Sequence, residues 1–336
     1  MQGTNLVTLN DVYRARRVVS KYLPRTLLMA SPALSKRLGF EAYVKCENTL
    51  PTGAFKVRGG VNLVSRLSKE QKRMGVITAS TGNHGQSVAY AASVFGVRTI
   101  VGMAEGANPI KVEAIRSFGA SVEFHGSDFD EARVWAEKEA ENKGYTYIHT
   151  ANEPMLIAGV GTIYLEIMED LPDVDVIIVP IGGGTSAAAA CIVAKTINPK
   201  VKVIGVQAEK APAVYLSWKN KRMIETKSAE TFAEGLATRV PFKLTLSTLN
   251  RMIDDIILVT DEEIERAILI LLETTHQLAE GAGAASTAAA FKIREKLQGK
   301  KVVLVLSGGN LTLKNLNTIF KAHSHPPLAG SSGDVV

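Results

Sequence analysis

The chain has 336 residues, of which 46% are hydrophobic and 21% charged, the balance of an ordinary globular protein. Its longest apolar runs are far shorter than the roughly 20 residues that cross a bilayer, and its N-terminus has no signal-peptide core. Cys46 and Cys191 form no CxxC pair, so we expect neither a disulfide framework nor a zinc site. These features exclude fibrous, disordered and disulfide-stapled proteins, and they favour a cytoplasmic protein without a membrane partner.

The formal net charge of +6 comes from 39 basic and 33 acidic residues. The basic residues are spread along the chain, with one tight cluster at Lys219, Lys221 and Arg222. Because clustered charge rather than a high pI indicates nucleic-acid binding, we expect no nucleic-acid partner.

Short β-rich runs alternate with longer helical patterns, which predicts an α/β fold with mostly parallel sheets and helices on both faces. The Pro/Gly/Ser-rich stretch 326–336 is expected to form a flexible tail. In chain order, the strands are expected at residues 76–79, 98–102, 121–124, 175–180, 202–206 and 301–306. Helices are expected at 86–95, 109–118 and 129–143, and a capping box at 260–263 opens another.

The first segment whose residues could take part in chemistry is TLPTGAFKVRG, residues 49–59. Lys56 stands between Phe55 and Val57, and apolar neighbours can desolvate a lysine, lower its pKa and make its amine nucleophilic. On an exposed helix the same lysine would only be a solvated charge.

The second segment is STGNHGQ, residues 80–86, which follows the expected strand at 76–79. It offers two hydroxyls, a carboxamide and backbone amides at a helix start, a set suited to holding a carboxylate. Ser80 or Thr81 could instead only cap the helix, but a cap needs one such residue rather than a run. His84 taken alone is more often a structural hydrogen-bonding residue than a base.

The third segment, IGGGTS at residues 181–186, lies between a strand and an alanine-rich helical run. Consecutive glycines at a helix N-terminus make a cradle for an anion, although a tight turn has the same composition. No Gly-Lys-Ser/Thr follows, so the segment is not a P-loop. With Ala187 and Glu209 it matches a loose dinucleotide fingerprint, but an oxidoreductase would leave the other segments unexplained. Two more glycine turns lie at 280–284 and 307–310.

A candidate nucleophilic lysine, a lysine-free phosphate cradle and a carboxylate-binding loop are what an amino-acid enzyme using pyridoxal 5′-phosphate (PLP) needs. The motifs PTGAFKVRGG, STGNHGQ, PIGGGTS, AEGAGA and LSGGN, in this order and spacing, resemble the fold-type II PLP-dependent enzymes, which share the tryptophan synthase β-like fold. The resemblance covers about residues 7–320 and is greatest to the threonine/serine dehydratase and serine racemase group. It implies a large PLP-binding domain, 1–70 plus 150–325, and a small inserted domain, 75–149.

The resemblance also implies roles for single residues. Lys56 would bind the cofactor covalently and later remove the substrate Cα proton, with Phe55 packed beside the ring. Asn83 would hydrogen-bond the 3′-oxygen, and Ser307 would face the pyridine nitrogen. A serine there, in place of an aspartate, makes the ring a weaker electron sink and favours expulsion of a β-hydroxyl. The phosphate would be held by Gly182, Gly183, Gly184 and Thr185, and the substrate carboxylate by Ser80, Thr81, Gly82 and His84.

The implied activity is a lyase of amino-acid catabolism, a homodimer or homotetramer that converts L-threonine or L-serine into a 2-oxo acid and ammonia. Alternatives are a serine racemase, or a dehydratase of hydroxyaspartate or phenylserine. Serine racemases have a second serine where Thr81 stands, and threonine is bulkier and stiffer, so racemisation is disfavoured. A non-catalytic sensor is disfavoured because Lys56 is present.

Two further expectations follow from the resemblance. Some relatives bind a divalent cation where this chain has Gln207, Ala211 and Ala213, so we expect no metal site. The sequence ends shortly after the last helical pattern, so we expect no C-terminal regulatory domain and no feedback inhibition by isoleucine.

Overall fold

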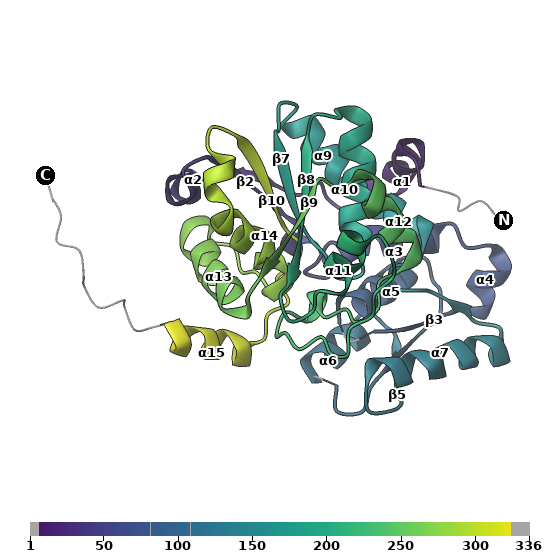
Figure 1. The fold of residues 1–336 in the computed structure, drawn as a ribbon. Helices are drawn as coiled ribbons and strands as arrows, with labels where there is room; N and C mark the ends of the chain where they lie inside the picture. Colours follow the sequence, from purple (N-terminus) through teal and green to yellow (C-terminus); the bar gives the residue numbers. More distant parts are fainter. Residues whose placement is uncertain (1–6, 81, 108, 324–336) are drawn as a thin grey trace, which may run out of the picture.

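The computed structural model describes residues 7–80, 82–107 and 109–323, which form a six-stranded and a four-stranded sheet (Figure 1). Strand pairing is parallel except between β1 and β2. The larger sheet has the order β1-β2-β10-β7-β8-β9, with β1 (Leu28–Ala30), β2 (Glu41–Cys46), β7 (Val176–Pro180), β8 (Lys202–Ala208), β9 (Asp255–Val259) and β10 (Lys301–Leu306). The smaller has the order β5-β4-β3-β6, with β3 (Val76–Ala79), β4 (Thr99–Met103), β5 (Ser121–Phe124) and β6 (Thr146–Tyr147).

Helices cover both faces of the larger sheet because its strands are apolar on both sides. In β10, Val303 and Val305 belong to one buried core, and Val302, Leu304 and Leu306 belong to the other. The first core includes residues of α1 (Leu9–Tyr22), α8 (Pro154–Val160), α9 (Thr162–Asp170), α10 (Thr185–Ile197), α11 (Ala213–Asn220) and α12 (Lys243–Met252). The second includes residues of α2 (Pro32–Leu38), α13 (Asp261–Thr275), α14 (Gly281–Lys292) and α15 (Leu313–His323).

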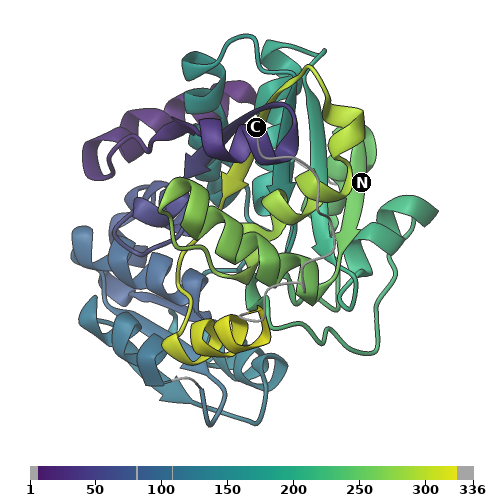
Figure 2. The ribbon, with the colours of Figure 1, turned by 90° about the vertical axis from the view of Figure 1, so that its left-hand side faces the viewer.

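The smaller sheet has its own helices, and this blue part of the chain lies at the lower left of Figure 2. Residues of α5 (Asn83–Val94) and α6 (Pro109–Ser117) pack on one face, and those of α7 (Phe129–Lys143) on the other. Between the sheets, α3 (Lys56–Ser65) packs against α5 and α8. The remaining short elements are α4 (Lys69–Met74) and the 3-10 turns η1 (Glu47–Thr49), η2 (Glu234–Leu236) and η3 (Arg294–Leu297).

The predicted α/β class with mostly parallel sheets is confirmed, and the expected strands lie within two residues of their predicted ends. The capping box is also confirmed, since the Thr260 hydroxyl accepts the Glu263 N–H while the Glu263 carboxylate accepts the Thr260 N–H. The helix predicted at 86–95 begins earlier, at Asn83, because the Ser80 hydroxyl accepts the N–H groups of Gly82 and Gly85. The predicted tail, 326–336, lies outside the described residues. No helix of the described chain is long and apolar enough to cross a membrane.

The order of the strands brings three of the motif segments described above to one edge of the larger sheet. The strands β2, β10 and β7 are neighbours and parallel, so their carboxyl ends lie side by side. Residues 49–59 follow β2, residues 307–310 follow β10, and residues 181–186 follow β7. This edge is where open α/β sheets bind ligands. Residues 80–86 follow β3 of the smaller sheet and approach the same region.

Candidate active site

Lys56 is the first residue of α3, and its ammonium lies 5.6 Å from the centre of the Phe55 ring. Burial lowers the pKa of Lys56 from 10.5 to about 8, although the negative charge of Glu280 opposes this shift. The amine is therefore unprotonated far more often near neutral pH than that of an ordinary lysine. A desolvated amine of this kind is the nucleophile that a carbonyl cofactor requires.

The segment before Lys56 pairs with the turn after β10, which places Ser307 beside Phe55, the residue before the lysine. The Phe55 N–H donates to the Ser307 carbonyl oxygen at 3.0 Å, and the Asn310 amide donates to the Thr52 carbonyl oxygen at 2.8 Å. Ser307 is only 3% exposed, so a ligand bound at this turn would meet its hydroxyl in a largely desolvated place.

The glycine loop after β7 packs so closely on neighbouring segments that its first two glycines have no room for a side chain. A Cβ on Gly182 would overlap the carbonyl oxygen of Gly235. A Cβ on Gly183 would lie 2.7 Å from the Cβ of Ala151. Gly184, the N-cap of α10, has a φ of +85°, a conformation that side-chain-bearing residues rarely adopt. The hydroxyl of Thr185 is buried and has no hydrogen-bond partner among residues 7–80, 82–107 and 109–323. An unpartnered hydroxyl and free N–H groups at a helix N-terminus fit a phosphate.

Asn83 joins the smaller sheet to the larger one through two hydrogen bonds. Its Nδ2 donates to Glu280 Oε1 at 2.6 Å, and its Oδ1 accepts from Asn310 Nδ2 at 2.8 Å. These partners fix the orientation of the amide and leave one Nδ2 hydrogen for a ligand. The site thus contains the predicted Asn83 in a defined pose.

Glu280 was not predicted as a site residue. It precedes α14, accepts the Asn83 amide, and its charge acts on Lys56. Burial raises the pKa of Glu280, while the Asn83 hydrogen bond and the charge of Lys111 lower it. The available signal was the single acid that opens the otherwise small and apolar AEGAGA segment.

The other residues predicted for the carboxylate loop differ in what their side chains do. The Ser80 hydroxyl accepts the N–H groups of Gly82 and Gly85, so it shapes the turn. The His84 Nε2 lies 3.0 Å from the Thr78 hydroxyl, and burial lowers the pKa of His84 to about 3, so the ring is neutral and hydrogen-bonded within the smaller sheet. Thr81 lies outside the described residues.

The loop that contains Gln207, Ala211 and Ala213 is organised by the side-chain amide of Gln207. The Gln207 Oε1 accepts the Tyr215 N–H at 2.8 Å, in the first turn of α11. Ala211 and Ala213 contribute no side-chain oxygen, and no group of three His, Cys, Asp or Glu in the described part of the chain could hold a metal ion. The absence of a metal remains an expectation.

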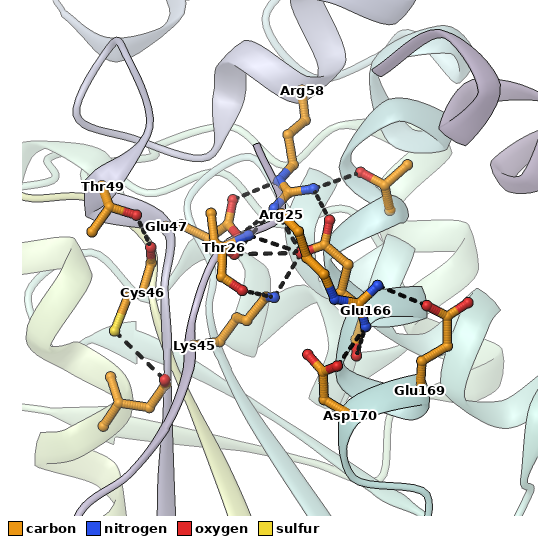
Figure 3. Close-up of polar contacts among 12 residues, drawn as sticks. Arg25, Thr26, Lys45, Cys46, Glu47, Thr49, Arg58, Glu166, Glu169 and Asp170 are labelled. Atoms are coloured by element: carbon orange, nitrogen blue, oxygen red, sulfur yellow. Dashed lines mark hydrogen bonds and ion pairs between the residues drawn. The ribbon is translucent and has the colours of Figure 1, made fainter. Parts of the chain in front are cut away.

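A buried group of charges holds α3 in place (Figure 3). Arg58 donates to both carboxylate oxygens of Glu47, at 2.8 and 2.9 Å, and to Glu166, at 2.7 and 2.9 Å. Lys45 donates to the same Glu166 at 2.6 Å. We call these four residues, all less than 9% exposed, the Arg58 network. It ties α3, just after Lys56, to β2 and α9, and sequence analysis did not identify it.

The low pKa of Lys56 predicts a pH dependence of stability for the cofactor-free protein. Between pH of about 8 and 10.5 the unfolded lysine binds a proton that the folded lysine has lost, so the free energy of unfolding should rise with pH. Below pH of about 8 the destabilisation is fully present, and above 10.5 it is gone. Urea unfolding of wild type and Lys56→Met across this range should show a rise in the wild type alone. Parallel curves would contradict the burial of Lys56.

The unpartnered Thr185 hydroxyl predicts opposite effects on ligand binding and on stability. Thr185→Val should weaken PLP binding roughly 10- to 100-fold, the contribution of a hydrogen bond to a charged group. The cofactor-free protein should be at least as stable as wild type, because a buried unsatisfied hydroxyl is removed. Thr185→Ser, which keeps the hydroxyl, is the control. Equal PLP affinity in all three proteins would remove Thr185 from the phosphate site.

Comparisons with known proteins identify the family of this chain. The pyridoxal-phosphate dependent enzyme family matches residues 19–308. The chain is 42% identical to L-threonine ammonia-lyase of Thermotoga maritima, over 94% of this chain and 78% of that protein. The processed form of threonine deaminase isoform 2 from Solanum lycopersicum has a TM-score of 0.89 at 30% identity, covering 95% of each chain. Serine racemase from Dictyostelium discoideum has a TM-score of 0.85 at 35% identity, covering 91% of this chain and 99% of that one. The predicted family is thereby confirmed, and the chain belongs to the pyridoxal-phosphate dependent enzymes of fold type II.

Proposed function

We propose that this protein is a PLP-dependent ammonia-lyase that converts L-threonine, and L-serine, into a 2-oxo acid and ammonia. The observation that carries the proposal is the desolvated amine of Lys56, on a segment whose backbone is hydrogen-bonded to Ser307 at the carboxyl end of β10. The names of the Thermotoga and Solanum proteins support the same reaction. The balanced conversion is L-threonine to 2-oxobutanoate and ammonia: water leaves from Cα and Cβ, and water then replaces the nitrogen.

The residues present fit the cofactor, which supplies an electron sink for the pair left at Cα when its proton is removed. Lys56 Nζ, with its lowered pKa, would bond the cofactor aldehyde until the substrate amine displaces it, and the freed amine would then accept the Cα proton. The free Nδ2 hydrogen of Asn83 would face the 3′-oxygen, and Phe55 would lie beside the ring. The neutral Ser307 hydroxyl would face the pyridine nitrogen, which keeps the electron sink weak and favours loss of the β-hydroxyl.

The phosphate would sit in the glycine loop at the N-terminus of α10, held by Gly182, Gly183, Gly184 and Thr185. The substrate carboxylate would lie at the start of α5, at Ser80, Thr81, Gly82 and His84. For Ser80 and His84 we propose that the backbone faces the ligand, because both side chains are hydrogen-bonded within their own loop and sheet.

We further propose that the two sheets mark two domains, residues 1–70 with 150–325 and residues 75–149, with the cofactor between them. A homodimer or homotetramer in the cytoplasm is proposed from the family resemblance.

The proposed function is tested by incubating the PLP-loaded protein with L-threonine and with L-serine while 2-oxo acid and ammonia are measured together. One mole of each per mole of substrate consumed is expected. Release of neither product from either substrate would overturn the proposal.

Serine racemisation is the second candidate, favoured by the likeness to the Dictyostelium racemase. Chiral analysis of serine after incubation separates the two reactions. Accumulation of D-serine faster than pyruvate would make racemisation the main activity.

A further inference from the structure

The smaller and larger sheets meet at an ion pair beside the predicted carboxylate loop. Lys111, in the first turn of α6, pairs with Glu234 of η2. The Lys111 side chain is 12% exposed, although α6 is a surface helix of the smaller sheet, and Glu234 is 51% exposed. The pair therefore joins a nearly buried cation of the smaller sheet's helix to an acid on the side of the larger sheet.

The ammonium of Lys111 lies directly over the turn that begins α5. A Cβ built on Gly82 would be 3.6 Å from Lys111 Nζ and 3.5 Å from its Cδ. Gly82 immediately precedes Asn83, whose N–H and neighbouring amides form the start of α5. A positive charge therefore stands beside the backbone that is suited to an anion, and it adds to the partial positive charge of the helix N-terminus.

Glu234 holds this ammonium from the side of the larger sheet. The next residue, Gly235, has its carbonyl oxygen packed against Gly182 of the glycine loop. Lys111, Glu234 and Glu280 also line one recess of about 20 Å³, room for a single water molecule. The recess brings the Lys111–Glu234 pair next to Glu280, which accepts the Asn83 amide at the start of α5.

We propose that Lys111 is a positioning residue that draws the substrate carboxylate to the Gly82 turn, and that Glu234 is the counter-ion that keeps Lys111 over this turn. This inference rests on the proposed function for the identity of the ligand, an amino acid. It differs from that function in assigning the charge that orients the carboxylate.

The test uses L-alanine, which has the α-carboxylate and amine but no β-hydroxyl to lose, and L-alaninamide, which lacks the carboxylate. Both are titrated into the PLP-loaded protein while the cofactor absorbance is followed. Lys111→Met should weaken L-alanine binding about tenfold, since the attraction between the Lys111 ammonium and the carboxylate of L-alanine is removed. L-alaninamide binding should be unchanged, because this ligand has no carboxylate. Lys111→Arg should restore most of the affinity for L-alanine.

Lys143→Met is the matched control, because Lys143 forms an ion pair with Glu139 on α7 and lies on another helix of the same sheet. It should change neither affinity. Glu234→Gln should alter L-alanine affinity only when Lys111 is present, so that the double variant equals Lys111→Met alone. In turnover of L-threonine, Lys111→Met should raise KM more than it lowers kcat.

Two results would overturn the inference: equal loss of affinity for L-alanine and L-alaninamide in Lys111→Met, or no loss for either. The proposed function fails separately, if wild type binds L-alanine in the Lys111-dependent way but releases no 2-oxo acid from threonine. A wild-type protein that binds PLP but not L-alanine would overturn the inference, and product release from L-threonine would still decide the proposed function.

Discussion

Lys56→Ala should lower turnover of L-threonine by at least about 10⁴-fold, the upper range for a positioned acid–base group, and should remove the absorbance of lysine-bound cofactor. The reason is that one amine serves both to bond the cofactor and to move the Cα proton. The fold should persist, because the removed group is a desolvated amine whose burial destabilises the protein near neutral pH. Circular dichroism and urea unfolding of the cofactor-free protein check this part.

Lys72→Ala is the matched control for Lys56→Ala. The Lys72 ammonium also lies over a phenylalanine ring, 5.4 Å from the centre of Phe95, but on α4 and away from the glycine loop. Its replacement should leave both the absorbance and the turnover intact. Turnover retained in Lys56→Ala would contradict the assignment of the nucleophile.

Arg58→Met should lower the free energy of unfolding by about 3–5 kcal/mol, the usual effect of breaking a buried ion pair by removing one partner. The variant leaves the carboxylates of Glu47 and Glu166 with only Lys45 as a buried cation. The network is neutral as it stands, with two cations and two carboxylates, so the loss of Arg58 leaves an uncompensated negative charge. Urea unfolding of the cofactor-free protein measures the effect.

Arg25→Met provides the comparison, because Arg25, in the loop before β1, also pairs with acids of α9. Arg25 pairs with Glu169 and Asp170 at the end of α9, but its side chain is 45% exposed (Figure 3). Exposed ion pairs contribute about 0–1 kcal/mol, so this variant should be close to wild type. If Arg58→Met is no more destabilised than Arg25→Met, the Arg58 network does not hold α3 in place.

Much of the fold could be predicted from local pattern. The apolar runs at 76–79 and 301–306 coincide with β3 and β10, because a strand covered on both faces has a continuous apolar sequence. The order of strands in each sheet was less accessible, since nothing in the run at 301–306 says that it pairs with both β2 and β7. Which strands pair depends on packing between residues that are far apart in the sequence.

The residues of the candidate site were likewise predictable only in part. Lys56, Asn83 and Ser307 stand out because their motifs have unusual composition, and the structure brings all three motifs together. Glu280 and Lys111 were missed because their roles depend on neighbours far away in sequence. The side chains of Ser80 and His84 show the opposite case, since polar residues in a functional loop can serve the loop itself.

The most direct test is an absorbance spectrum of the purified protein with PLP, followed by addition of L-threonine and then L-serine to the same cuvette. We expect a cofactor band near the visible edge that changes on each addition and is accompanied by 2-oxo acid. A protein that shows no such band after PLP is added would contradict the account of the site centred on Lys56.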